Sequence, residues 1–186
     1  MLFRSWCAYG LGKIAPELAI DQREDDAQSL CFDTAPLTKP MAIVGRTHVR
    51  LRVAADRPQA QIAVRLNAIH PDGKVERITY GLLNLAHRES HERPRPLKPG
   101  QFYEVTVALK EIAQTVPKGH RLRLAVSTSY WPIAWPSPEP ATVTVDPSRS
   151  RLELPVLPSE KGLAKVRFAP VEMAQIAPVT VKDPGA

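Results

Sequence analysis

The sequence predicts an all-β fold, a jelly-roll β-sandwich with few short helices. From Leu37 to Leu154, branched apolar residues alternate with polar or charged ones, which is the pattern of strands that bury one face. Proline makes up 19 of the 186 residues, about twice its usual share, against only 9 glycines. Strands and helices do not alternate along the chain, so a doubly wound α/β fold is excluded.

Eight strands are expected, and each follows from the same alternation. In residues 48–53, for example, Val49 and Leu51 would face the core and Arg50 would face outward. The expected strands are residues 30–33, 48–53, 61–67, 74–85, 104–110, 121–126, 142–145 and 152–154. Only residues 18–29 and 110–115 have a helical pattern, and both segments are short.

Turn residues separate these strands. The sequence His-Pro-Asp-Gly at 70–73 places proline at the second turn position and glycine where a positive φ is needed, so a hairpin is expected there. Lys-Pro-Gly at 98–100 and Val-Pro-Lys-Gly at 116–119 precede the strands that begin near Phe102 and Arg121.

Length and composition indicate one domain with flanking segments. We assign residues 1–28 to an N-terminal lead-in, 29–155 to the sandwich and 156–186 to a proline-rich extended tail. Glycine, lysine and proline interrupt the N-terminal apolar patch, and the longest charge-free run contains three prolines, so neither a signal peptide nor a membrane span is expected. Cys7 and Cys31 form no disulfide framework, and a cytoplasmic location is expected.

The net charge of +6 and the pI near 9.5 raise the question of nucleic-acid binding. Five arginines weigh against it, because they fall at outward positions of expected strands: Arg50, Arg52, Arg65, Arg121 and Arg123. No recognition helix, zinc-finger spacing or aromatic platform accompanies them. We interpret them as a solvated sheet face, and expect no nucleic-acid or membrane partner.

Two polar segments resemble reactive sites, and both have a plainer interpretation. His87 and His91 are four residues apart, a spacing that ligates zinc on a helix, but prolines follow at once and no third ligand is near. A polar loop or an interface role is favoured for them. Ser127 and Ser129 lie outside any nucleophile elbow, so no catalytic residue is assigned. Without a phosphate loop or dinucleotide fingerprint, no cofactor or metal is expected.

The most distinctive segment, residues 127–138, places three aromatics and three prolines after a core strand. Its candidate interface or ligand residues are Tyr130, Trp131 and Trp135. The tryptophans could cap the end of the sandwich, dock on another protein or stack on a ligand. If they dock, an exposed apolar patch is expected around these three aromatics.

Several segments, taken in order, resemble one family. They are residues 21–33, Pro-Leu at 36–37, Ile-Val-Gly at 43–45, Asn-Leu-Ala-His-Arg-Glu-Ser-His at 84–91, Pro-Lys-Gly-His-Arg-Leu-Arg-Leu at 117–124, and 127–138. From about Trp6 to Pro155 the chain resembles the C-terminal, non-catalytic domain of the X-Pro dipeptidyl-peptidase and cocaine-esterase-like (CocE/NonD) hydrolases.

The resemblance implies a galactose-binding-domain-like jelly roll that follows an α/β-hydrolase domain. In that family the serine, aspartate and histidine of the hydrolase domain act on peptides, amides or esters, and they lie upstream of this module. No catalytic residue therefore carries over, and the expected role is to pack on the hydrolase domain, in cis or in trans, and to shape its active-site region.

The extent of the chain leads us to expect a truncated or split reading frame, or an isolated domain. Self-association through an exposed docking face would be a further consequence of such isolation. The alternative function is a free-standing jelly roll that binds carbohydrate through Trp131 and Trp135.

Overall fold

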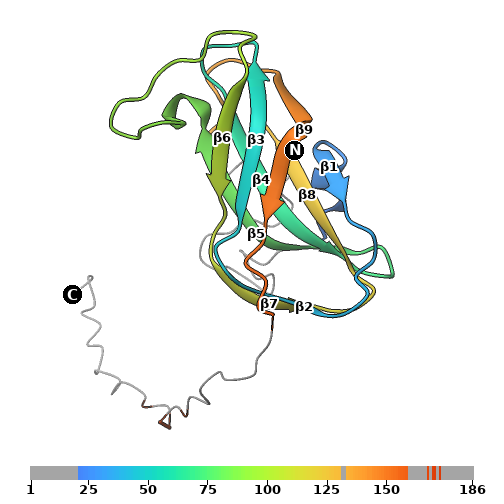
Figure 1. The fold of residues 1–186 in the computed structure, drawn as a ribbon. Coiled ribbons are helices and arrows are strands. Elements are labelled where there is room, and N and C mark those ends of the chain that lie inside the picture. The colour runs from blue at the N-terminus through green and yellow to red at the C-terminus, as the bar shows by residue number, and fades with distance from the viewer. Residues whose placement is uncertain (1–20, 131–132, 159–166, 168, 171, 173–186) are drawn as a thin grey trace, which may run out of the picture.

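Two antiparallel sheets face each other across a hydrophobic core. The computed structural model describes residues 21–130, 133–158, 167, 169–170 and 172. One sheet has the strand order β1-β8-β4-β5, the facing sheet has the order β6-β3-β9, and a two-stranded sheet of β2 and β7 lies at one end (Figure 1). The predicted all-β jelly-roll sandwich is confirmed.

The described elements follow the chain in this order: α1 (Arg23–Asp26), β1 (Leu30–Asp33), β2 (Met41–Gly45), β3 (His48–Ala55), β4 (Gln61–Ile69), β5 (Val75–Asn84), the 3-10 helix η1 (Leu85–His87), β6 (Tyr103–Ala108), β7 (Ile112–Val116), β8 (Arg121–Ser127) and β9 (Val143–Glu153). All named strands lie between residues 30 and 153. Most of the expected lead-in and tail lies outside the described residues.

Three expectations about these elements were wrong. Residues 110–115 are not helical, because Ile112–Val116 forms β7 and pairs with β2, a strand that was not expected. The segments 142–145 and 152–154 are not separate strands but parts of β9, which pairs with β3 on both sides of a register shift. In each case long-range pairing overrides the local pattern.

The predicted hairpin at residues 70–73 is confirmed. It joins β4 to β5, with Gly73 at a φ of +88° and its amide donating to the His70 carbonyl at 2.9 Å. Gly100 and Gly119 also have positive φ values, as their turn sequences require. These turns allow the strands to reverse direction at the ends of the sandwich.

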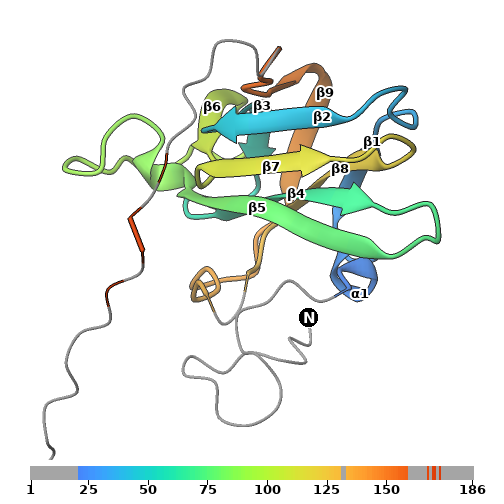
Figure 2. The same cartoon turned by 90° about the horizontal axis from the view of Figure 1, so that it is seen from below.

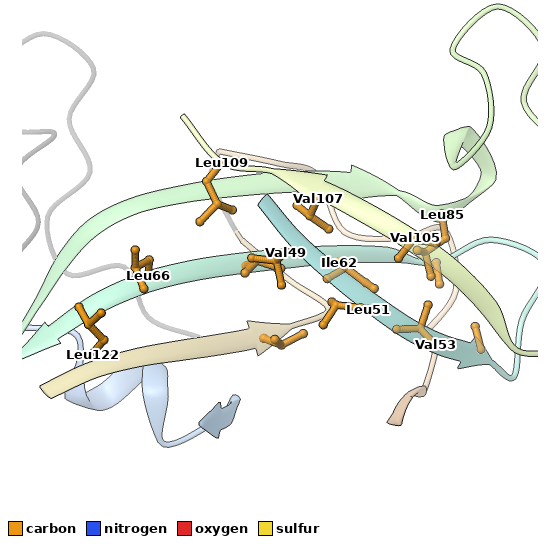
Figure 3. Packing of buried hydrophobic residues seen from close by; sticks show 14 of the residues in the cluster. Val49, Leu51, Val53, Ile62, Leu66, Leu85, Val105, Val107, Leu109 and Leu122 are labelled. Carbon is orange, nitrogen blue, oxygen red and sulfur yellow. The ribbon is translucent and has the colours of Figure 1, made fainter. Parts of the chain in front are cut away.

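The core lies between the inward faces of the two main sheets. Val49, Leu51 and Val53 of β3 pack toward Ile62 and Leu66 of β4, and each of the five is at most 2% exposed (Figure 3). Full burial of such a side chain contributes about 1.5–3 kcal/mol. The alternation in β3 and β4 therefore sets which side of each sheet faces the partner sheet.

The opposite side of the β1-β8-β4-β5 sheet is also covered in part. Seen from below, α1 and the loop that joins β8 to β9 lie beyond β4 and β5, on the side away from β3, β6 and β9 (Figure 2). We call this side the α1 face. It is the side of the sheet on which Gln61, Ala63, Arg65 and Asn67 of β4 and their partners on β5 and β8 lie.

Candidate functional site

A buried polar cluster holds the N-terminal segment on the α1 face. Arg65 points outward from β4, as expected, but only 1% of it is exposed, so its assignment to a solvated face was wrong. Its guanidinium lies 3.0 Å from the Asp26 carboxylate and donates to Ser29 Oγ at 2.9 Å and Gln22 Oε1 at 3.2 Å. Asn67 Nδ2 also donates to Asp26. A buried charge is retained when it is paired and hydrogen-bonded in this way.

A second arginine extends the cluster to β1. Arg123 of β8 donates to both carboxylate oxygens of Asp33 at 2.7 and 2.8 Å and lies 3.3 Å from Asp26. These hydrogen bonds lower the pKa of the Asp33 carboxyl. Burial has the opposite effect on Asp25, whose pKa is raised by desolvation. The cluster therefore fixes the acidic segment 21–33 against the sheet. The sequence did contain a signal for this cluster: two adjacent acidic residues, Asp25 and Asp26, and an arginine at an outward strand position, Arg65.

The aromatic loop after β8 begins with a buried anchor. Tyr130 is 1% exposed, so the expectation that it belongs to an exposed patch was wrong. Its ring lies 5.0 Å from that of Tyr80 on β5, and Arg77 donates to its hydroxyl. Burial raises the pKa of Tyr130, although the nearby Arg77 acts in the opposite direction. Tyr130 therefore fixes the start of the loop on the α1 face.

Trp135, five residues further on, is held by its backbone and exposed through its side chain. Gln61 Nε2 donates to the Trp135 carbonyl at 2.9 Å, and the amide of Ala134 donates to the Tyr130 carbonyl at the same distance. Trp135 is 78% exposed, the most exposed of the large hydrophobic residues in the described part of the chain. Trp131 lies outside the described residues.

Two further apolar side chains contribute to this exposed surface. Ile133 is 38% exposed in the same loop, and Leu82 is 37% exposed on β5. Leu82 pairs with Ala63, and Asn84 pairs with Gln61, so Leu82 neighbours the strand end that binds the Trp135 carbonyl. We call Leu82, Ile133 and Trp135 the docking patch. The sequence did not single out Leu82 or Gln61, because only strand pairing brings them to the loop.

The two histidines at and after η1, in what we call the η1 loop (residues 85–102), lie close together without a third potential metal ligand beside them among the described residues. The rings of His87 and His91 are 5.5 Å apart, and no group of three or more potential metal ligands occurs among the described residues. Arg88 holds this loop together. It donates to the carbonyls of Leu85 and Arg95, and its guanidinium lies over the ring of Tyr103, 4.3 Å from the ring centre. His87 and His91 remain predicted interface residues.

Ser127 and Ser129, at the end of β8 and just after it, do not form a nucleophilic site among the described residues. Ser127 Oγ donates to the Ser129 carbonyl at 2.9 Å, and no described histidine or carboxylate hydrogen-bonds to either serine. A serine nucleophile needs a base and oxyanion donors converging on it. The hydrogen bond that Ser127 donates is therefore a structural contact within the loop.

The outer side of the β6-β3-β9 sheet has a different character. Both arginines point outward there: Arg50 is 53% exposed and pairs with Glu153 at 2.9 Å, whereas Arg52 is 28% exposed and pairs with Asp146 at 2.7 Å, so the expected solvated position holds for Arg50 and not for Arg52. No helix in the described ranges is long and apolar enough to cross a bilayer. The α1 face, by contrast, combines the anchored loop after β8 with the exposed Leu82, Ile133 and Trp135.

Comparison with known proteins identifies the family. Residues 4–171 match the model of the X-Pro dipeptidyl-peptidase C-terminal non-catalytic domain. The chain belongs to this family. The predicted resemblance is thus confirmed, and the family is one in which this domain accompanies an α/β-hydrolase domain.

Individual relatives agree with the family match. The chain is 31% identical over 143 residues to a putative Xaa-Pro dipeptidyl-peptidase of Rhodopirellula baltica, covering 73% of the chain and 23% of that protein. It is 29% identical over 114 residues to cocaine esterase of a Rhodococcus species, covering 60% of the chain and 20% of that protein. The chain therefore spans only about a fifth to a quarter of these relatives.

Solved structures show the same fold. An alpha-amino acid ester hydrolase superimposes with a TM-score of 0.70 and 27% identity, covering 75% of the chain and 28% of that protein. An aminopeptidase from a marine sediment archaeon of the Thaumarchaeota superimposes with a TM-score of 0.68 at 22% identity, with the same two coverages, and supports the fold alone.

Proposed function

We propose that this chain is an accessory domain that packs on an α/β-hydrolase domain through the docking patch and shapes the entrance of its active site. The parent activity in this proposal is that of a dipeptidyl-peptidase or an acyl ester or amide hydrolase. The domain itself contributes surface and no reacting group.

The observation that carries this proposal is the exposed Trp135, whose backbone is held by hydrogen bonds. Trp135 is 78% exposed, while Gln61 donates to its carbonyl and the amide of Ala134 donates to the carbonyl of the buried Tyr130, which holds the backbone on either side. Large aromatic side chains are typical centres of protein interfaces, and a fixed backbone reduces the conformational entropy that is lost on binding. Leu82 on β5 and Ile133 in the same loop are further exposed apolar residues of the docking patch.

The position of the N-terminal segment also supports this face. The chain enters the domain through residues 21–33, which the Arg65 cluster fixes on the α1 face, the same side as the docking patch (Figure 2). Gln22 bonds to Val75 at the Ile69 end of β4, whereas Trp135 bonds to Gln61 at its start, so a domain that precedes this segment would reach the α1 face at the end of β4 away from Trp135. The N-terminal segment and the docking patch lie on the same side of the sandwich, and this favours the α1 face as the contact with the hydrolase domain.

A chimeric enzyme tests the proposal. The full chain replaces the C-terminal domain of the Rhodopirellula baltica relative, and hydrolysis of a chromogenic Xaa-Pro dipeptide anilide and thermal unfolding are measured. We expect an active chimera with one unfolding transition. Trp135→Ala should lower activity about tenfold or more and separate the transitions, since loss of a central aromatic anchor costs about 2 kcal/mol or more.

Two controls separate docking from folding. Val44 is 48% exposed on β2, so Val44→Ala should leave the chimera unchanged. The isolated chain with Trp135→Ala should unfold like the wild type within about 0.5 kcal/mol, because Trp135 is 78% exposed. A Trp135→Ala chimera that keeps full activity and a single transition would refute the proposed contact.

Two further measurements test the assignment of a non-catalytic role. A serine-directed fluorophosphonate should leave the isolated chain unlabelled, whereas labelling of Ser127 or Ser129 that is lost on denaturation would contradict the assignment. Titration with a glycan panel, followed by tryptophan fluorescence, addresses the carbohydrate-binding alternative. Saturable binding that Trp135→Ala abolishes would favour that alternative over docking.

A further inference from the structure

A groove lies on the outer side of the β6-β3-β9 sheet, where β9 departs from regular pairing with β3. Arg50 pairs with Arg151 and Arg52 pairs with Asp146, so residues 147–150 bulge outward opposite a single β3 residue. The groove has a volume of about 400 Å³, within the range of small-molecule sites. The polar residues on its walls are Arg50, Glu104, Thr106 and the four consecutive residues 148–151.

Hydrogen bonds fix the bulge that forms one wall of this groove. Ser150 Oγ accepts from the Arg52 amide at 3.1 Å and donates to the Asp146 carbonyl at 2.7 Å. The amide and the hydroxyl of Ser148 both donate to Asp146 Oδ1, at 3.1 and 2.6 Å. The groove is therefore shaped before any ligand arrives, which lowers the entropy lost on binding. β-Bulges commonly serve to direct side chains next to binding sites.

The charges around the groove are unbalanced. Arg50 and Arg151 occupy directly opposite positions on neighbouring strands, an arrangement that is destabilising for like charges. Both bind the single carboxylate of Glu153 through Nε, at 2.9 and 2.7 Å, and Arg149 binds Glu104 at 3.0 Å. Three guanidinium groups thus face two carboxylates. Each guanidinium has five N–H donors, so several remain for a ligand.

We propose that this groove binds a small molecule through a phosphate or sulfate monoester group, held mainly by Arg149 and Arg151. Planar guanidinium groups match tetrahedral oxyanions in a bidentate manner, and the hydroxyls of Thr106 and Ser148 on the walls supply further polar groups. A bound oxyanion would relieve the repulsion between Arg50 and Arg151.

The carboxylates around the groove favour a ligand with a single phosphate or sulfate group. Glu104, Asp146 and Glu153 interrupt the positive surface, so a long polyanion would meet carboxylates on leaving the groove. The β6-β3-β9 sheet, whose outer side carries the groove, lies across the sandwich from the α1 face (Figures 1 and 2). Binding here is therefore separate from docking through Trp135.

Isothermal titration of the full chain tests this site. The probes are inorganic phosphate, inorganic sulfate and α-glycerophosphate at constant ionic strength, with sodium chloride as the reference. We expect saturable one-site binding that Arg149→Gln/Arg151→Gln weakens at least about tenfold. Binding that tightens from inorganic phosphate to α-glycerophosphate identifies an ester as the ligand, and equal affinities identify the free oxyanion.

A matched variant controls for general charge effects. Arg95 is exposed in the η1 loop and paired with Glu89, so Arg95→Gln removes an arginine of similar exposure at a distant position. It should bind all probes like the wild type. No saturable binding up to about 10 mM, or equal losses in Arg95→Gln and the double variant, would overturn the proposal. Because Arg149 and Arg151 are 58% and 64% exposed, the double variant should fold normally, which circular dichroism checks.

Discussion

Replacing Arg65 by methionine is expected to destabilise the domain by about 3 kcal/mol. Methionine fills a similar volume but removes the guanidinium, which lies 3.0 Å from Asp26 and is 1% exposed. Removing one partner of a buried ion pair costs about 3–5 kcal/mol, because the other charge stays buried. The low end applies here, since Asn67 and Arg123 still contact the Asp26 carboxylate.

Urea and thermal unfolding of the full chain measure this effect. For a domain of this size, about 3 kcal/mol corresponds to a fall of about 10 °C in Tm. Arg46→Met is the control, because Arg46 is an exposed arginine, ion-paired with Glu111, and should change stability by at most about 0.5 kcal/mol. Adding Asp26→Asn to Arg65→Met should recover part of the loss, since the buried charge is then removed. Equal stability of Arg65→Met and Arg46→Met would refute the assigned role of the cluster.

Two further changes test other contacts. Arg123 lowers the pKa of Asp33, so the stabilisation from this carboxylate is complete above its unfolded pKa of about 3.9 and is lost as the pH falls through the lower folded value. In urea unfolding, Asp33→Asn should be less stable than the wild type at pH 6 and should lose less stability between about pH 4 and pH 2; parallel pH profiles would contradict this. Gly81→Ala should destabilise by about 1–3 kcal/mol in thermal unfolding, because the added Cβ would overlap the Ala108 carbonyl oxygen and lie 2.8 Å from Leu109 Cδ2; an unchanged Tm would show that β5 and β6 can separate at no cost.

The strands that the sequence predicted best are those with strict alternation. β3 and β4 follow their apolar residues closely, and the turn at residues 70–73 follows its proline and glycine. β7 was mistaken for a helix because its short, mixed pattern carries little periodic information, and pairing with β2 decides its conformation. Local sequence cannot report a partner that lies about 70 residues away.

The candidate site was predicted in outline and corrected in detail. The loop after β8 was recognised as distinctive, but its aromatics separate: Tyr130 is buried against Tyr80, whereas Trp135 is exposed. Leu82 and Gln61 were missed, because neither residue type carries a local signal for an interface. Their relevance depends entirely on the register between β4 and β5.

The sequence by itself determined which side of the strictly alternating strands β3 and β4 faces the core, where the chain turns at residues 70–73, and which family it resembles. These properties depend on the two-residue period of a strand and on local turn chemistry. Only the tertiary structure decided which outward residues meet solvent. Arg50 and Arg65 both point away from the core, yet one is solvated and the other is buried beneath the segment that carries Asp26. The exposure of an outward residue depends on which distant segment covers that face, and the alternation within one strand cannot predict this.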